Sequence, residues 1–282
     1  MSSVTSPLDT RAAGEWNVPV TIRTSPWPAG VPCWADLMTP DVEAARAFYG
    51  QVVGWDFQDT GDDYGGYVIA AVGASSAAGI GPAPEGLPSA WTMYIASDDV
   101  DKTAEAVTEN GGTIMMAPGD VGDLGRMFVG ADPTGAAFGV WQAGTNVGAE
   151  IVNEPGGITW EDLRSPDPDT ARQFYGDVFG YTYTPMPDAG TDYTMFHRAG
   201  EEAPLGGMGG TMGADGMPAH WVVYFSVAET DAAVTAAEAG GGTVIAPAFD
   251  TPYGRMAGIT DQAGAMFWVV QDTGQAGSDQ PE

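Results

Sequence analysis

Side chains that could do chemistry are few in this chain of 282 residues. It contains one cysteine, Cys33, one lysine, Lys102, and two histidines, His197 and His220. Cys33 lies in an apolar run, which favours a small buried residue over a nucleophile. The sequence has no Ser–His–Asp order, CxxC pair or dinucleotide-binding fingerprint. The chemistry that remains is acid–base work by aspartate, tyrosine and histidine, together with stacking on aromatic rings.

The charge balance narrows the range of partners. Lys and Arg total 9 against 38 Asp and Glu, which gives a formal net charge of -29. Such a surface repels phosphate backbones and anionic lipid, so we expect no nucleic-acid and no membrane partner. Residues 1–30 lack a basic start followed by an apolar stretch, and no run of about 18 apolar residues occurs. We therefore expect a cytoplasmic protein.

Aromatic and acidic residues recur in a duplicated passage. "WADLMTPDVEAARAFYG" begins at Trp34, and "WEDLRSPDPDTARQFYG" begins at Trp160, 126 positions later. The stretches "WTMYIA" at Trp91 and "WVVYFS" at Trp221 repeat at a spacing of 130. Repetition at nearly constant spacing indicates a tandem duplication with short loop insertions. The seam falls within residues 142–157.

The elements that position these residues also repeat inside each copy. In the first copy, a strand at 32–38 precedes a helix capped by Thr39 or Asp41, and three strands follow. The order then restarts with the strand "WTMYIAS", a helix capped by Asp98 or Asp99, and three more strands. The chain is therefore expected to hold four βαβββ units, two in each copy.

The motifs "LMTPDVEAARAFY" and "LRSPDPDTARQFY", with the later turns "DPTG" and "DQAG", resemble the vicinal oxygen chelate superfamily of glyoxalases, bleomycin-resistance proteins and dioxygenases. The resemblance covers residues 31–271 and is nearest to a two-domain actinobacterial branch with hydroxylase and glyoxalase-like labels. It implies an α+β fold, in which two such domains in tandem each form a cupped mixed sheet from two βαβββ units. We expect domains at 31–145 and 157–272, an N-terminal extension over 1–30 and a flexible tail over 273–282.

The resemblance also implies where a metal would bind. Metal-dependent members use a His on the first strand, a His on the fifth and a Glu on the eighth, with a further ligand from the fourth in some. The aligned positions hold, in the two copies, Trp34 and Trp160, Thr92 and Val222, Gly139 and Trp268, and Ile80 and Met208. A divalent metal needs about three N or O ligands, so we expect no metal and no other cofactor. The alternative is a shifted site built from His220, Asp162 and one other acid.

Side chains alternate along a strand, so the residues on the face of the lost ligands should line the two cups. The predicted ligand-binding residues are Trp34, Asp36, Thr92, Tyr94 and Trp141 in copy one, and Trp160, Asp162, Arg164, His220, Tyr224 and Trp268 in copy two. This set suits a flat, largely apolar ligand with some oxygens, although the aromatic rings could instead simply fill the core. Because Trp268 stands where copy one has Gly139, we expect more room in copy one.

Two functions fit these residues. The first is metal-independent binding of a small, flat aromatic natural product, an antibiotic or polyketide intermediate, in secondary-metabolite biosynthesis or self-resistance. The second is a metal-free enzyme of hydroxylase, lyase or isomerase type that acts on such a compound. There Asp36 or Asp162 would be the acid–base group, and Tyr94, Tyr224 or His220 would stabilise an enolate or phenolate. A metabolite-sensing regulator is a further alternative, and the protein is expected to be a monomer or homodimer.

Overall fold

The structure, a computed structural model, describes residues 23–61, 64–187, 192–211 and 216–271. Most of the predicted N-terminal extension and the whole predicted tail lie outside these ranges. None of the helices in the described part has the length and apolar character that a membrane crossing requires.

Copy one contains two βαβββ units, as the repeated sequence predicts. Its elements are β1 (Pro32–Thr39), α1 (Val42–Val52), β2 (Asp56–Asp59), β3 (Val68–Val72), β4 (Ser75–Pro82), β5 (Ala90–Ala96), α2 (Val100–Glu109), β6 (Thr113–Val121), β7 (Gly125–Ala131) and β8 (Ala137–Ala143). They form one sheet of eight strands in the order β2-β3-β4-β1-β5-β8-β7-β6. The two units therefore meet at β1 and β5, which pair antiparallel.

Copy two repeats this plan. Its elements are β9 (Ile158–Arg164), α3 (Pro168–Phe179), β10 (Tyr181–Pro185), β11 (Tyr193–Arg198), β12 (Gly206–Gly209), β13 (His220–Ser226), α4 (Thr230–Ala239), β14 (Thr243–Thr251), β15 (Gly254–Thr260) and β16 (Met266–Gln271). The sheet order β10-β11-β12-β9-β13-β16-β15-β14 matches that of copy one strand for strand. The predicted tandem α+β fold is confirmed.

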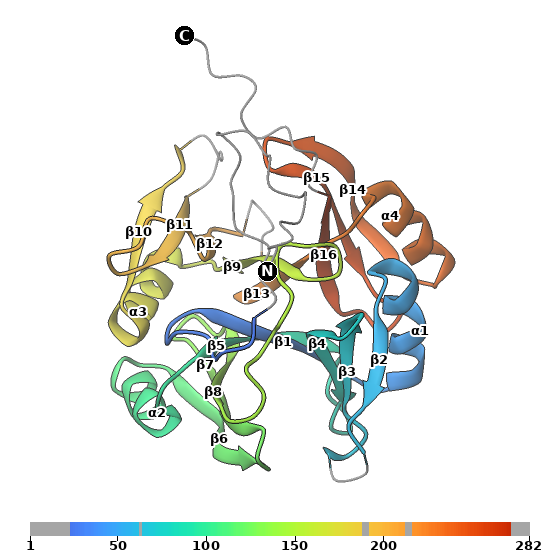
Figure 1. Ribbon diagram of the computed structural model, residues 1–282. Helices are drawn as coiled ribbons and strands as arrows, with labels where there is room; N and C mark the ends of the chain where they lie inside the picture. Colours follow the sequence, from blue (N-terminus) through green and yellow to red (C-terminus); the bar gives the residue numbers. More distant parts are fainter. Residues whose placement is uncertain (1–22, 62–63, 188–191, 212–215, 272–282) are drawn as a thin grey trace, which may run out of the picture.

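The helices of the two copies meet in pairs at the sides of the molecule (Figure 1). Helix α1 lies beside α4, and α2 lies beside α3. Aspartate side chains begin three of the helices: Asp41 accepts from Ala44 N, Asp99 from Lys102 N and Asp167 from Thr170 N. These caps satisfy backbone N–H groups that the first helical turn leaves without a partner.

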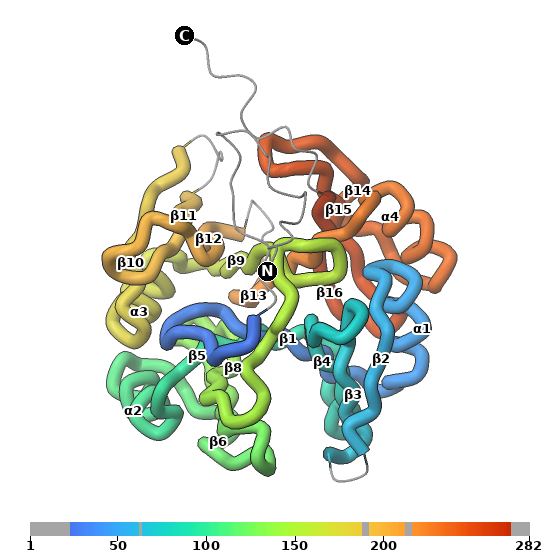
Figure 2. The backbone as a smooth tube through the Cα atoms, viewed as in Figure 1, coloured from blue at the N-terminus to red at the C-terminus, as the bar shows by residue number. Residues whose placement is uncertain are grey.

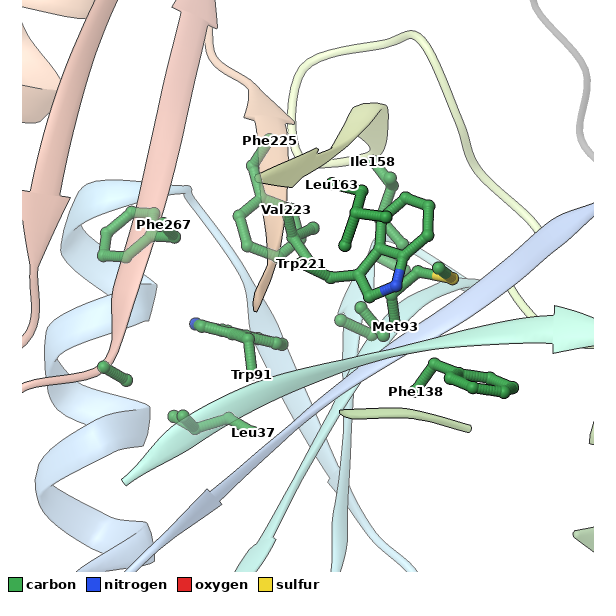
Figure 3. Packing of buried hydrophobic residues seen from close by; sticks show 14 of the residues in the cluster. Leu37, Trp91, Met93, Phe138, Ile158, Leu163, Trp221, Val223, Phe225 and Phe267 are labelled. Carbon is green, nitrogen blue, oxygen red and sulfur yellow. The ribbon is translucent and has the colours of Figure 1, made fainter. Parts of the chain in front are cut away.

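One hydrophobic core spans both copies (Figure 3). Phe225 on β13 of copy two packs its ring 4.9 Å from the rings of both Trp55 and Trp91 of copy one. Phe225 itself is fully buried. Because the largest buried rings contact each other across the boundary, neither copy is expected to keep its core without the other.

The repeated "FY" of α1 and α3 contributes tyrosines to the interior between the copies. The ring of Tyr49 lies 5.1 Å from that of Phe267 in copy two. Its hydroxyl donates to Asp261 Oδ2 at 3.1 Å and accepts from Trp91 Nε1 at 3.0 Å. The duplicate, Tyr175, accepts from Trp221 Nε1 at 2.8 Å. The duplicated tyrosines thus hold the interior together and lie outside the cups.

Glu161 is a buried acid at this boundary. It precedes Asp162 on β9, so its side chain points to the opposite face of the sheet, toward the core. Burial raises the pKa of Glu161 to about 8, and the charge of Asp162 adds to the rise. Burial also raises the pKa of the Cys33 thiol of copy one, and the nearby Glu161 carboxyl contributes to that rise. Glu161 is therefore protonated in the folded protein at neutral pH.

Replacing Glu161 by glutamine is expected to stabilise the protein at pH 8 and to have little effect near pH 4.5. Because the folded pKa lies above the unfolded value, the wild type loses stability as pH rises from about 4.5 to about 8. Glutamine cannot ionise, so the difference in melting temperature between the two proteins should grow to several degrees over that range. Thermal unfolding at a series of pH values measures it, with the exposed Glu238→Gln as the control. A constant difference at all pH values would refute the assignment.

Candidate binding cups

Each sheet has one face that carries the repeated tryptophan and aspartate, and we call this face the cup of its copy. In copy one, Trp34 and Asp36 on β1 pair in register with Tyr94 and Thr92 on β5. In copy two, Trp160 and Asp162 on β9 pair with Tyr224 and Val222 on β13. The two cups therefore have equivalent positions around one central aspartate.

The cup of copy two contains a closed hydrogen-bond network around Asp162. Its Oδ1 accepts from Trp160 Nε1 at 2.9 Å and from Tyr193 OH at 2.7 Å. Its Oδ2 accepts from Tyr224 OH at 2.9 Å and from Arg164 Nη2 at 2.5 Å. Asp162 is buried, and four donors compensate its lost hydration.

The cup of copy one repeats this network without the cation. Tyr94 OH donates to Asp36 Oδ2 at 3.1 Å, and Tyr67 OH donates to the same oxygen at 3.5 Å. Trp34 Nε1 donates to Tyr67 OH at 3.0 Å. The position of Arg164 is taken by Met38. The second oxygen, Asp36 Oδ1, is buried and has no hydrogen-bond partner.

This difference changes the acidity of Asp36. Burial raises its pKa to about 7, while the hydrogen bonds from Tyr94 and Tyr67 oppose the rise. No positive side chain joins the Asp36 network among its described hydrogen bonds and ion pairs. Asp36 therefore changes charge near neutral pH, in the range where a general acid or base is effective.

The prediction that copy one has more room is wrong. The side chain of Tyr94 fills the space over Gly139, where even a single Cβ atom would collide with its ring. Trp27 and Ala149 also pack against the cluster that contains Trp34 and Tyr94, and Trp27 Nε1 donates to Ala149 O at 3.0 Å. Ala149 belongs to the segment that joins β8 to β9 along copy one (Figure 2). Trp34 is 7% exposed and Tyr94 only 3%.

Copy two instead has an accessible apolar wall. Trp268 on β16 stacks on Tyr224, with ring centroids 5.6 Å apart, and Phe249 on β14 meets Trp268 edge-on at 6.1 Å. Ile245 lies over Gly258, the residue next to Trp268 in the sheet. Phe249 is 42% exposed and Ile245 46%. An exposed apolar surface beside a polar network is typical of a ligand site.

Other residues predicted from the sequence lie as follows. Thr92 is half-buried on the cup face beside Asp36, and Trp141 packs against the copy-one cluster with Nε1 donating to Asn146 O at 3.0 Å. His220 pairs in register with Arg164, and its Nδ1 bonds Pro218 O at 2.8 Å.

The fourth-strand positions assigned from the sequence, Ile80 and Met208, are wrong for the cup. Both are fully buried in the core, in register with Leu37 and Leu163. Successive side chains of a strand point to opposite faces, so the adjacent residues Gly79 and Gly207 face the cups. They pair in register with Asp36 and Asp162.

Sequence reasoning missed Tyr67 and Tyr193, which complete the two networks. Each lies over a glycine of the neighbouring strand, Gly79 or Gly207, where a Cβ atom would collide with the phenol oxygen. The signal was present, because Tyr67 and Tyr193 are 126 positions apart, the spacing of Trp34 and Trp160. The predicted cup residues come from the first, fifth and eighth strands of each copy, whereas Tyr67 precedes β3 and Tyr193 begins β11.

Two hollows are found in the described part of the chain, and the second shares a residue with the copy-two cup. One of about 430 Å³ lies between α1 and α4 and is lined by Ala47, Phe48 and Ala236 among others. The other, of about 380 Å³, is lined by Arg172, Met186 and Tyr193 among others. Tyr193 thus belongs both to this hollow and to the Asp162 network.

The side chains of the cups do not fit a divalent metal. Both oxygens of Asp162 already accept hydrogen bonds, one of them from the cation Arg164. Asp36 is surrounded by phenols and an indole, which are poor ligands for such ions. Within the described ranges, no three His, Cys, Asp or Glu residues are grouped to hold a metal ion. The shifted site from His220 and Asp162 is therefore not formed.

The duplicated sheets with their cups define a protein of the vicinal oxygen chelate type. Residues 33–162 and 157–269 both match the Glyoxalase/Bleomycin resistance protein/Dioxygenase superfamily, and the chain belongs to this family.

Its relatives cover nearly the whole chain. The protein is 42% identical over 261 residues to "Putative glyoxylase CFP32" of Mycobacterium tuberculosis, covering 90% of this chain and 99% of that protein. It is 38% identical over 260 residues to the anthracycline biosynthesis protein DauV of Streptomyces sp. (strain C5), covering 86% and 93%. A Mn(II)-bound glyoxalase from Novosphingobium aromaticivorans has a TM-score of 0.60 at 16% identity over 86% of this chain and 82% of that one, which shows the shared fold alone.

Proposed function

We propose that the protein binds a small, flat aromatic natural product, without a metal, in the cup of copy two. The role we infer is in the biosynthesis of a secondary metabolite or in self-resistance to it. The similarity to proteins named for anthracycline biosynthesis supports this ligand class. We expect the protein to act in the cytoplasm as a monomer or homodimer.

The observation that carries the proposal is the composition of the copy-two cup. Trp268 occupies the position of the eighth-strand metal ligand, and it forms an accessible aromatic wall with Phe249. Beside this wall, on the same face of the sheet, lies a polar group of side chains held by Asp162. A flat ring system can stack on Trp268 while its oxygens bond the polar side, and neither contact needs a metal.

Removing the Trp268 ring is expected to weaken binding of an anthracycline by about tenfold or more. A stacking pair contributes about 0.5–1.5 kcal/mol beyond buried area, and 1.4 kcal/mol is a factor of ten. Quenching of tryptophan fluorescence by the ligand, in protein treated with EDTA, compares wild type with Trp268→Ala and Trp160→Ala. Trp34→Ala in the covered cup of copy one is the matched control and should leave the affinity unchanged. Equal affinities of all four proteins would rule out the copy-two cup.

A second candidate function, a metal-free acid–base enzyme, is favoured by Asp36. Its unpartnered Oδ1 and a pKa of about 7 suit a group that takes up and releases a proton. Trp27 and Ala149 pack with Trp34 and Tyr94, the residues beside Asp36 in the copy-one cup.

If this enzyme function operates, the protein should exchange hydrogen for deuterium in D₂O at the carbon beside a ketone of an anthracycline. Asp36 acts as a base only when ionised, so the exchange rate should rise with pH through about 7. Mass spectrometry of the ligand measures the exchange, and Asp36→Asn should abolish it. Exchange that persists in Asp36→Asn, or that is no faster than without protein, would exclude Asp36 as the base.

A further inference from the structure

Arg164 places a cation in the copy-two cup at a position where copy one has the uncharged Met38. It follows Asp162 by two residues on β9 and so shares the cup face. Its side chain is 14% exposed, and its guanidinium lies 5.1 Å from the centre of the Tyr193 ring. Stacking on Tyr193 and pairing with Asp162 hold the guanidinium in one orientation.

Most hydrogen-bonding capacity of Arg164 is free. A guanidinium has five N–H donors, of which Nη2 donates to Asp162 Oδ2, and the Tyr224 hydroxyl is a further hydrogen-bond partner of Arg164. Asp162 also receives three neutral donors, from Trp160, Tyr193 and Tyr224. These donors already stabilise the carboxylate, so Arg164 can share its charge with a second anion.

The position of Arg164 relative to the aromatic wall determines how long a ligand must be to contact both. Trp160, Tyr224 and Trp268 are neighbours in register across three strands, and Arg164 lies four residues beyond Trp160. Four residues of strand span about 13 Å, and Trp268 is displaced by two strands of about 4.8 Å each, so the backbone positions of Trp268 and Arg164 are about 16 Å apart. A molecule of three or four fused rings, together with the two side chains, is long enough to bridge this distance. A ligand stacked on Trp268 can therefore direct a group at its far end to Arg164.

We propose that the cup of copy two selects aromatic ligands that carry a carboxylate, and that Arg164 binds this carboxylate. This inference rests on the proposed function of the same cup. The chain carries a net charge of -29, so its surface repels anions in general. A fixed guanidinium inside the cup then distinguishes an aromatic acid from its neutral analogues, because planar N–H pairs match carboxylate geometry.

The test compares anthraquinone-2-carboxylate with the neutral anthraquinone-2-carboxamide as probes, using fluorescence quenching. Wild type should bind the carboxylate about tenfold more tightly than the amide. Arg164→Met copies the Asp36–Met38 arrangement of copy one, which is tolerated in this fold. It should remove the preference for the carboxylate over the amide. Arg198→Met removes an equal charge from copy two outside the network, where Arg198 pairs with Glu201, and should retain the preference.

The outcomes separate the two proposals. If both probes bind with equal affinity, or if Arg164→Met keeps the preference, carboxylate selection is wrong and the aromatic-binding function stands. If neither probe binds to wild type, the proposed function fails and the carboxylate selection fails with it. Arg164→Lys keeps the charge and should keep part of the preference, so it supplies the answer if the methionine variant does not fold.

Discussion

Replacing Asp162 by alanine is expected to destabilise the protein by about 3–5 kcal/mol, the cost of breaking a buried ion pair by removing one partner. The substitution leaves Arg164 without its partner and removes the acceptor from Trp160, Tyr193 and Tyr224. Urea unfolding near pH 7 measures the change in the free energy of unfolding.

Copy one supplies the matched control for this experiment. Asp36→Ala removes the equivalent carboxylate, but only the phenols of Tyr67 and Tyr94 lose an acceptor. We expect a cost of about 1–2 kcal/mol at pH 5, the usual penalty for an unpaired buried polar group. The cost should shrink as pH rises through 7, because the raised pKa of Asp36 makes ionised wild type less stable. Equal losses for the two substitutions at pH 7 would contradict the assigned difference between the cups.

Replacing Phe225 by alanine is expected to cost about 3–5 kcal/mol and to lower the stability of both copies together. The ring is fully buried in copy two, yet it lies against Trp55 and Trp91 of copy one. Removing it opens a cavity in the shared core (Figure 3), so a single unfolding transition should move down by about 10 °C.

Differential scanning calorimetry distinguishes this from independent copies. The control Leu87→Ala removes an exposed leucine from a loop and should shift the transition by less than about 1 °C. Two separate transitions, of which only one moves in Phe225→Ala, would show that each copy has its own core.

The repeat at 126 positions predicted two copies with equivalent elements, because similar hydrophobic patterns fold into similar elements, and the resemblance to the vicinal oxygen chelate superfamily added the cupped sheets. Alternation along β1 and β9 then placed Trp34, Asp36, Trp160 and Asp162 on one face of each sheet. The face on which a strand residue lies depends only on its position along that strand, so the sequence alone predicts it.

The openness of each cup depends instead on contacts between distant segments. Trp27 and Ala149 pack in the same cluster as Trp34, although they lie on opposite sides of copy one in the sequence. Tyr94 fills the space over Gly139 through the direction of its side chain, which composition does not predict. The accessible wall also depends on such contacts, because Phe249 reaches Trp268 only through the pairing of β14 with β15.

The most direct test of metal-free aromatic binding in copy two is a crystal structure. Protein first stripped with EDTA would be supplied with Mn²⁺ and Zn²⁺, soaked with an anthracycline, and measured for anomalous scattering. The account predicts ring density against Trp268, with polar contacts toward Arg164, and no anomalous peak in either cup. A metal peak beside Asp162 or Asp36 with the ligand coordinated to it would contradict the account, as would a ligand bound elsewhere with the copy-two cup unaltered.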